Sequence, residues 1–227
     1  MFSLSSLLPK NKISFSQCGE DLLIDFVFKN LLRIEKPTFL DIGANDPIVF
    51  NNTFRFYRNG CRGINIDPNK ESINSFNRKR KNDINIHCGI GRKKETKKFY
   101  IFENSMLNTF DGEVAHIQGG VVATEEVQVE TIANVLRHHQ FSAIPDFLSL
   151  DTEGMDKEIL EAIFSVSDEF GLPKVICVET IKKLGAGEWQ KDLVLVEHLK
   201  SFGYIHHSDT FINSIFVHPR FLKVKIH

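Results

Sequence analysis

The stretch "FLDIGAND" (residues 39–46) decides the predicted fold of this chain. Its first residues are mostly apolar, and Gly43 and Ala44 follow them directly. A short apolar run bounded by turn residues is typical of a buried strand. Because Gly43 and Ala44 carry little or no side chain, a ligand can approach the backbone there. The stretch therefore predicts a strand whose carboxyl end borders a binding site, with Asp41 close to it.

Similar apolar runs recur along the chain, and helical patterns separate them. The predicted strands of this kind are residues 38–43, 62–67, 84–90, 146–151 and 174–179. The predicted helices are residues 19–33, 51–60, 69–81, 131–139, 155–164 and 190–203. Strands that alternate with helices at this spacing form parallel βαβ units with right-handed crossovers. The predicted fold class is α/β, a Rossmann-like sheet of about seven strands with helices on both faces.

Two parts of the chain depart from this alternation. Residues 97–102 and 125–132 alternate between apolar and polar types, which predicts antiparallel or edge strands. Residues 103–124 contain several glycines and are predicted to form a loop. Residues 203–208 and 214–219 are predicted to pair as a hairpin at the end of the sheet.

The composition excludes several classes of protein. The 227 residues are 42% hydrophobic, which suits one globular domain with a sizeable core. The chain has 28 basic and 29 acidic residues, so no overall charge favours nucleic acid as a partner. The basic runs "NRKRK" (77–81) and "GRKKETKK" (91–98) are predicted to be solvated loops or helix ends, with phosphate contact as the alternative.

Membrane and redox signals are also weak in this sequence. No apolar stretch approaches the roughly 20 residues that span a bilayer, so no membrane span is predicted. The four cysteines show no metal-type pairing and are interpreted as reduced thiols of a cytoplasmic protein. They are Cys18, Cys61, Cys88 and Cys177.

Four predicted strands end in acids, namely Asp41, Asp67, Asp151 and Glu179. The carboxyl ends of parallel strands meet at one edge of a sheet, where ligands bind in open α/β folds. Clustered carboxylates are costly to desolvate unless they have partners or a ligand. Each acid could instead cap the helix that follows it, but four together favour a binding site.

The loop after the first strand favours a cationic ligand over a dinucleotide. It lacks the G-x-G-x-x-G pattern, and Pro47 offers no N–H group to a pyrophosphate. Asp41 would repel a pyrophosphate and attract a sulfonium, while Asp67 is placed to accept hydrogen bonds from ribose hydroxyls. An NAD- or nucleotide-sugar-binding enzyme and a non-catalytic nucleoside-binding module are the alternatives.

Five motifs resemble those of the FkbM-type methyltransferases, class I enzymes that use S-adenosylmethionine. The motifs are "SQCGEDLLI" (16–24), "FLDIGANDPIVFNNT" (39–53), "GINIDPN" (63–69), "LSLDTEGMDKEIL" (148–160) and "ICVET" (176–180). The resemblance covers about residues 14–180, and it departs from the family at Pro47, where many members carry glycine.

The resemblance implies a seven-stranded sheet whose last strand is antiparallel, within a single domain over residues 1–227. Residues 1–36 would form a helical cap over the cofactor, and residues 97–130 an irregular insertion that faces the acceptor. The cofactor would be S-adenosyl-L-methionine, with S-adenosyl-L-homocysteine as its product. The implied cofactor-binding residues are Gln17, Glu20 (or Asp21), Asp41, Gly43, Ala44, Asn45, Asp67, Pro68, Cys88 and Gly89.

The activity that the resemblance implies is O-methylation, with an acceptor hydroxyl on a sugar of a surface glycan or on a secondary metabolite. The acceptor would be a small molecule or a nucleotide-linked sugar, and the oligomeric state stays open. A sugar hydroxyl is a weak nucleophile and needs a general base. Asp151 or Glu153 is the expected base, and Glu179 is the reserve candidate.

Alternatives to these roles remain. The same acids could hold a divalent metal, and Glu153 could cap the helix that begins near Met155. Ser105, Asn108 and Thr109 are candidates for binding a polyol. The histidines considered as bases are interpreted as surface residues; they are His116, His138, His139, His206 and His207.

Overall fold

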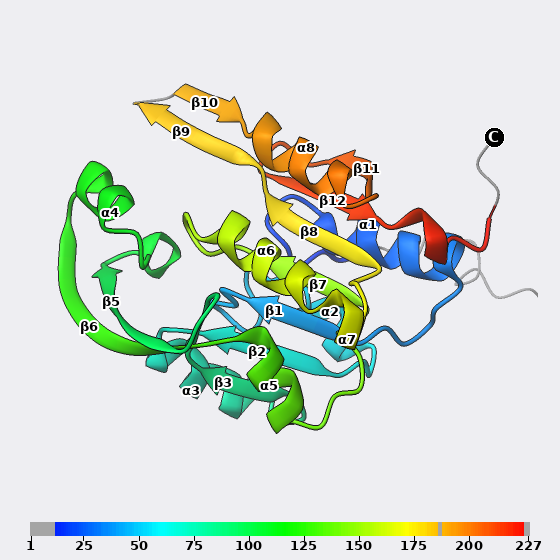
Figure 1. The fold of residues 1–227 in the computed structure, drawn as a ribbon, viewed down its shortest axis with the longest axis horizontal. Helices are drawn as coiled ribbons and strands as arrows, with labels where there is room; N and C mark the ends of the chain where they lie inside the picture. The colour runs from blue at the N-terminus through cyan, green and yellow to red at the C-terminus, as the bar shows by residue number, and fades with distance from the viewer. Residues whose placement is uncertain (1–11, 186–187, 225–227) are drawn as a thin grey trace, which may run out of the picture.

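A computed structural model describes residues 12–185 and 188–224, and its centre is a seven-stranded sheet (Figure 1). The strand order is β11, β12, β8, β7, β1, β2, β3. The strands are β1 (Phe39–Ile42), β2 (Gly63–Asp67), β3 (Ile84–His87), β7 (Phe147–Leu150), β8 (Val175–Glu179), β11 (Ile205–Asp209) and β12 (Asn213–Val217). Only β12 runs antiparallel to its neighbours, β8 and β11. The predicted sheet, mostly parallel with an antiparallel last strand, is confirmed.

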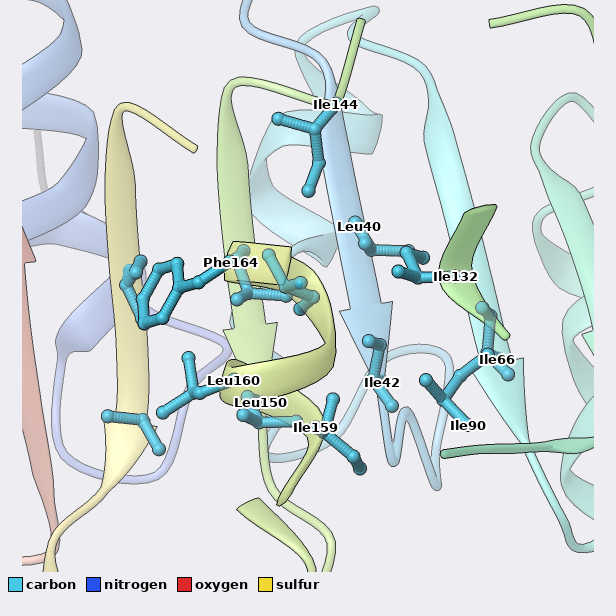
Figure 2. Packing of buried hydrophobic residues seen from close by; sticks show 14 of the residues in the cluster. Leu40, Ile42, Ile66, Ile90, Ile132, Ile144, Leu150, Ile159, Leu160 and Phe164 are labelled. Carbon is cyan, nitrogen blue, oxygen red and sulfur yellow. The ribbon is translucent and has the colours of Figure 1, made fainter. Parts of the chain in front are cut away.

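Helices cover both faces of this sheet. They are α1 (Glu20–Phe26), the π-helix η2 (Val27–Leu32), α2 (Phe54–Arg58), α3 (Lys70–Lys79), α5 (Ile132–His138), α6 (Asp156–Ser165), α7 (Ser167–Phe170) and α8 (Leu193–Ser201). On one face, α5, α6 and α8 pack on strand residues such as Leu40 and Leu150, and Figure 2 shows α6 lying over this layer. On the other face, α1, η2 and α2 pack on Phe39 and Phe147. The prediction of helices on both faces is confirmed.

Side-chain caps explain where several helices begin. The Asn69 side chain accepts the backbone N–H of Glu71 at 2.9 Å and starts α3. Thr131 caps α5 in the same way through the N–H of Asn134. Such caps satisfy N–H groups that have no partner inside the helix. In both cases the capping residue could be read from the sequence.

A smaller sheet and a hairpin extend from the central layer. The smaller sheet has the order β4 (Gly89–Ile90), β6 (Val121–Glu130), β5 (Glu95–Phe102). Between β5 and β6 lie the short 3-10 helix η3 (Ser105–Leu107) and α4 (Gly112–Gln118). The hairpin pairs β9 (Ile181–Gly185) with β10 (Glu188–Lys191), and η4 (Pro219–Phe221) follows β12. In Figure 1 the β5–β6 arm and the β9–β10 hairpin project from the sheet as separate extensions.

The structure corrects several predicted elements. Residues 84–90 do not form one strand, because the chain leaves the central sheet at Cys88 and β4 pairs with β6 instead. Residues 103–124 are not simply a loop, since they contain η3 and α4. The side chain of Asp111 starts α4 by accepting the N–H groups of Glu113 and Val114. The last predicted helix begins only at Leu193, where Asp192 caps it.

No helix described within residues 12–185 and 188–224 is both long enough and apolar enough to cross a bilayer.

Candidate functional site

A cavity lies at the carboxyl ends of the central strands. Asp41 of β1, Asp67 of β2 and Asp151, which directly follows β7, all contribute to its wall. Phe99 and Phe110 of the β5–β6 arm close another side. The volume is about 970 Å³ when the part open to solvent is counted. Three of the four acids that end predicted strands therefore border one cavity, as the parallel topology predicts.

Asp67 joins the loops that follow β1 and β2. Its carboxylate accepts the backbone N–H of Asn45 and that of Asn69, both at 2.7 Å. Burial raises the pKa of Asp67 to about 6, although these two hydrogen bonds oppose the rise. Each carboxylate oxygen can accept more than one hydrogen bond, so Asp67 keeps acceptor capacity for a ligand in the cavity.

Asp41 is held from behind by a buried polar network. Thr53 and Asn51 donate to the same oxygen of Asp41, at 2.8 and 3.1 Å. Arg80 in turn donates to Thr53 at 2.8 Å and to Asn51 at 3.1 Å, and it pairs with Asp83 at 2.9 Å. Burial raises the pKa of Asp41, while the Arg80 charge and the Thr53 hydrogen bond oppose the rise.

Gly43 is needed for a reason that differs from the one inferred from the sequence. Its φ is +78°, and a Cβ atom there would lie 1.7 Å from the carbonyl oxygen of Asp151. The close approach of the loop after β7 therefore excludes any side chain, whether or not a ligand is bound. Next to it, Asp46 closes the turn around Pro47 by accepting the N–H groups of Ile48 and Val49, both at 2.8 Å.

A second group of acids lies at the ends of β7 and β8. One carboxylate oxygen from each of Asp151, Glu153 and Glu179 lies within 4.8 Å of the other two. Asp151 is accessible from the cavity although protein surrounds it, and Glu153 also lines the cavity. Oxygen atoms in this arrangement suit either shared protons or a divalent cation.

The charges of these acids oppose one another. Burial, followed by the charges of Glu179 and Glu153, raises the pKa of Asp151 well above its usual range. Burial and the charge of Asp156 raise the pKa of Glu153 to about 7. Burial and the charges of Glu153 and Asp156 raise the pKa of Glu179 to about 8. At neutral pH the group therefore holds protons and can accept another from a ligand.

The backbone and the helix start hold this group in place. Glu153 adopts a positive φ of 51°, and its carbonyl accepts the Thr109 hydroxyl at 2.7 Å. The alternative that Glu153 caps α6 is wrong, because Met155 is the N-cap residue and no side chain caps that helix. Asp156 accepts the N–H and the hydroxyl of Thr152 instead.

Some residues implied to bind cofactor lie outside the cavity wall as described. Glu20 is fully buried and accepts hydrogen bonds from Thr210 and Asn213, which tie α1 to the turn between β11 and β12. Cys88 is buried, and its pKa is raised to about 12. Gly89 backs the ring of Phe110, since a Cβ atom there would lie 2.7 Å from it. Their roles toward a cofactor stay predictions.

The other implied residues lie in the cavity wall. They are Gln17, Asp41, Gly43, Ala44, Asn45, Asp67 and Pro68. Ser105 and Asn108 also line it, and the Ser105 hydroxyl lies 2.9 Å from the Asn45 side-chain oxygen. Within the described part of the chain, the wall includes none of the histidines that were considered as bases.

Sequence reasoning missed the residues behind Asp41. The run "NRKRK" was predicted to be solvated, which is wrong for Arg80, because its side chain is fully buried. Asn51 and Thr53 stand in the quoted motif "FLDIGANDPIVFNNT" but received no role. The run of three polar residues directly before α2, residues 51–53, was the available signal, since buried polar side chains need partners.

Comparisons with known proteins identify the family of this chain. The model of the methyltransferase FkbM domain matches residues 41–206, more than half of the chain. No curated protein matches the chain. The crystal structure of methyltransferase FkbM from Methylobacillus flagellatus KT is similar, with a TM-score of 0.46 and 13% sequence identity. The similarity covers 81% of this chain and 44% of that one, so the aligned part spans less than half of the length of that protein. The family match shows that this chain belongs to the methyltransferase FkbM domain family.

Proposed function

We propose that this chain is an S-adenosylmethionine-dependent O-methyltransferase whose acceptor is a sugar hydroxyl. The observation that carries the proposal is that Asp41, Asp67 and Asp151, from three neighbouring strands, border one cavity. The family match supports methyl transfer as the type of reaction. The sugar acceptor comes from the resemblance of the motifs and is the finer part of the proposal.

The cavity residues suit a cationic nucleoside. Asp67 would accept the ribose hydroxyls while its two backbone hydrogen bonds keep it in place. Asp41, braced by Thr53 and Asn51, would attract the cationic methionine end. Gln17 lines the same wall and would close over it. When bound, S-adenosylmethionine supplies a methyl group on a sulfonium, which is transferred to the acceptor oxygen as the carbon–sulfur bond breaks.

Asp151 is the proposed general base. It lines the cavity, and burial, together with the charges of the acids around it, raises its pKa well above its usual range. A base of this kind accepts the hydroxyl proton as the new oxygen–carbon bond forms. Glu153 and Glu179 would share the added proton within the group. The aromatic rings of Phe99 and Phe110 would exclude water from that side of the cavity.

Two measurements test the proposal. Calorimetry with S-adenosylhomocysteine should show binding to the full chain, and labelled S-adenosylmethionine should transfer its methyl group to at least one member of a panel of methyl glycosides. Absence of nucleoside binding would reject the cofactor. Binding without transfer to any glycoside, including anionic and amino sugars, would reject the sugar acceptor.

A further inference from the structure

The wall of the cavity is unusually acidic. Its described residues include five carboxyl groups, from Asp41, Asp46, Asp67, Asp151 and Glu153. Within residues 12–182 and 188–224, whose side chains the structure describes, no lysine, arginine or histidine belongs to the wall. Glu179 adds a sixth carboxyl group beside Asp151 and Glu153. An anion that enters this cavity would therefore meet those carboxylates that remain ionised, and no cation in the described wall offsets their charge.

Three cations of the neighbouring elements, Arg80, Lys182 and Lys191, form ion pairs with other acids. Arg80 is fully buried behind Thr53 and Asn51, and it pairs with Asp83. On the hairpin side, Lys182 pairs with Asp192 at 2.7 Å, and Lys191 pairs with Asp209. None of these three side chains belongs to the described wall of the cavity. Their charges are offset locally, so they do little to neutralise the cavity.

The carboxylates at this end of the sheet repel one another. Burial raises the pKa values of Asp151, Glu153 and Glu179, and the charges of neighbouring acids raise them further. Like charges raise each other's pKa because the ionised forms repel. The same repulsion acts on any anionic group brought into the cavity, and a low-dielectric wall strengthens it.

The rim of the cavity adds apolar surface to this acidic interior. Phe50 is 56% exposed, lines the cavity and adopts a positive φ of 53°. Val49 beside it is 57% exposed and also lines the cavity, and Met106 faces it from η3. Aromatic and aliphatic side chains at a rim suit the C–H faces of an uncharged ring, while the carboxylates suit its hydroxyl groups.

We propose that the acceptor enters this cavity without negative charge, as a neutral polyol or an amino sugar. This inference rests on the proposed function and narrows its acceptor. It excludes nucleoside-diphosphate sugars, sugar phosphates and uronic acids, whose anionic groups the wall would repel. Neutral hydroxyls can donate to the carboxylates, and an ammonium group can pair with them.

The experiment compares matched acceptors on the full chain. Transfer from labelled S-adenosylmethionine is measured for methyl glycosides and for their 6-phosphate, uronate and 2-amino counterparts, with EDTA and separately with MgCl2. The neutral and amino sugars should exceed the anionic ones in kcat/KM by about tenfold or more, and added salt should narrow the gap. Equal or faster transfer to the anionic sugars in either condition would overturn the inference.

A charge added to the wall gives a second test. Met106→Lys should raise kcat/KM for the phosphate relative to the neutral sugar by about tenfold, and Met106→Gln, the uncharged control, should not. An equal change in both variants would contradict a charge effect. Calorimetry with S-adenosylhomocysteine keeps the two proposals apart. If the unsubstituted chain binds S-adenosylhomocysteine but prefers anionic acceptors, only the proposed acceptor class is wrong. If the unsubstituted chain does not bind S-adenosylhomocysteine, the proposed function is wrong.

Discussion

Arg80 is linked to Asp41 through one hydroxyl group. Thr53 accepts a hydrogen bond from the Arg80 guanidinium at 2.8 Å and donates one to the Asp41 carboxylate, also at 2.8 Å. Arg80 and Asp83 are both buried, so the positive charge lies inside the protein between two acids. The buried guanidinium of Arg80 thus holds Asp41 in place through Thr53. Arg80 itself is not part of the described cavity wall.

Arg80→Leu should lower the free energy of unfolding by about 3–5 kcal/mol, because it leaves buried acids without their cation. Denaturant unfolding followed by circular dichroism measures the change. Arg78→Leu is the matched control, since Arg78 lies exposed in α3, two residues before Arg80. It should change stability by no more than about 0.5 kcal/mol. Similar losses in the two variants would contradict the role of burial.

Asp67→Ala should weaken binding of S-adenosylhomocysteine by roughly 1–3 kcal/mol, since hydrogen-bonding groups lose their partner. The substitution also frees the N–H groups of Asn45 and Asn69, which shape the wall. Isothermal titration calorimetry gives the affinity, with Glu71→Ala on the exposed first turn of α3 as the control. An unchanged Kd for Asp67→Ala would show that Asp67 does not bind the ribose hydroxyls.

The ligand-free protein should lose stability as the pH rises from about 6.5 to 8. Burial lowers the pKa values of His139, His198, His207 and His218, which has the opposite effect below this range. Folding raises the pKa values of Asp67, Glu153 and Glu179 to about 6, 7 and 8. The folded state then holds protons that the unfolded state has released. Each such proton contributes a slope of up to about 1.4 kcal/mol per pH unit, negative with increasing pH.

Glu179→Gln tests this dependence, because it removes one of the three acids. Its unfolding free energy, measured by denaturant at several pH values, should fall less steeply than that of the parent above pH about 7. Glu188→Gln, an exposed change on β10, should keep the parent slope. A parent protein that becomes more stable over this pH range would contradict the raised pKa values.

Asp151→Asn should leave binding of S-adenosylhomocysteine near normal and lower kcat by about 10²–10⁴, the usual contribution of a general base. The base must be ionised, so the parent rate should rise with pH through the raised pKa of Asp151. Glu179→Gln removes a neighbouring charge and should move this rise to lower pH. Full activity of Asp151→Asn would show that Asp151 is not the general base, and Glu153 and Glu179 would be the remaining candidates.

Removal of divalent metal is expected to leave turnover unchanged. Asp151, Glu153 and Glu179 can relieve their repulsion by holding protons, because their pKa values are raised. Rates measured after EDTA dialysis, and again after Mg²⁺ or Ca²⁺ is added, check this. Activity that is lost with EDTA and restored by the metal would show that the acids bind a cation, as oxygen ligands can.

Much of the fold followed from local patterns in the sequence. Apolar runs that end in Asp41, Asp67 and Asp151 alternate with helical patterns, and this order predicts parallel strands whose acids meet at one edge. The parallel order of the strands therefore largely determines that these acids border one cavity. Local caps such as Asn69 could also be read directly, because a cap and its helix are neighbours in the chain.

What the sequence could not decide depends on partners far apart in the chain. Only the tertiary structure buries Arg80 among acids, joins Glu20 to Asn213, and moves the chain out of the central sheet at Cys88. It also shows that the approach of Asp151 requires a glycine at Gly43, independently of any ligand. Hydrophobic periodicity in the sequence indicates only how a residue is placed within its own helix or strand. The partner of a buried charge, and the closest backbone to a glycine, are set when distant segments pack together.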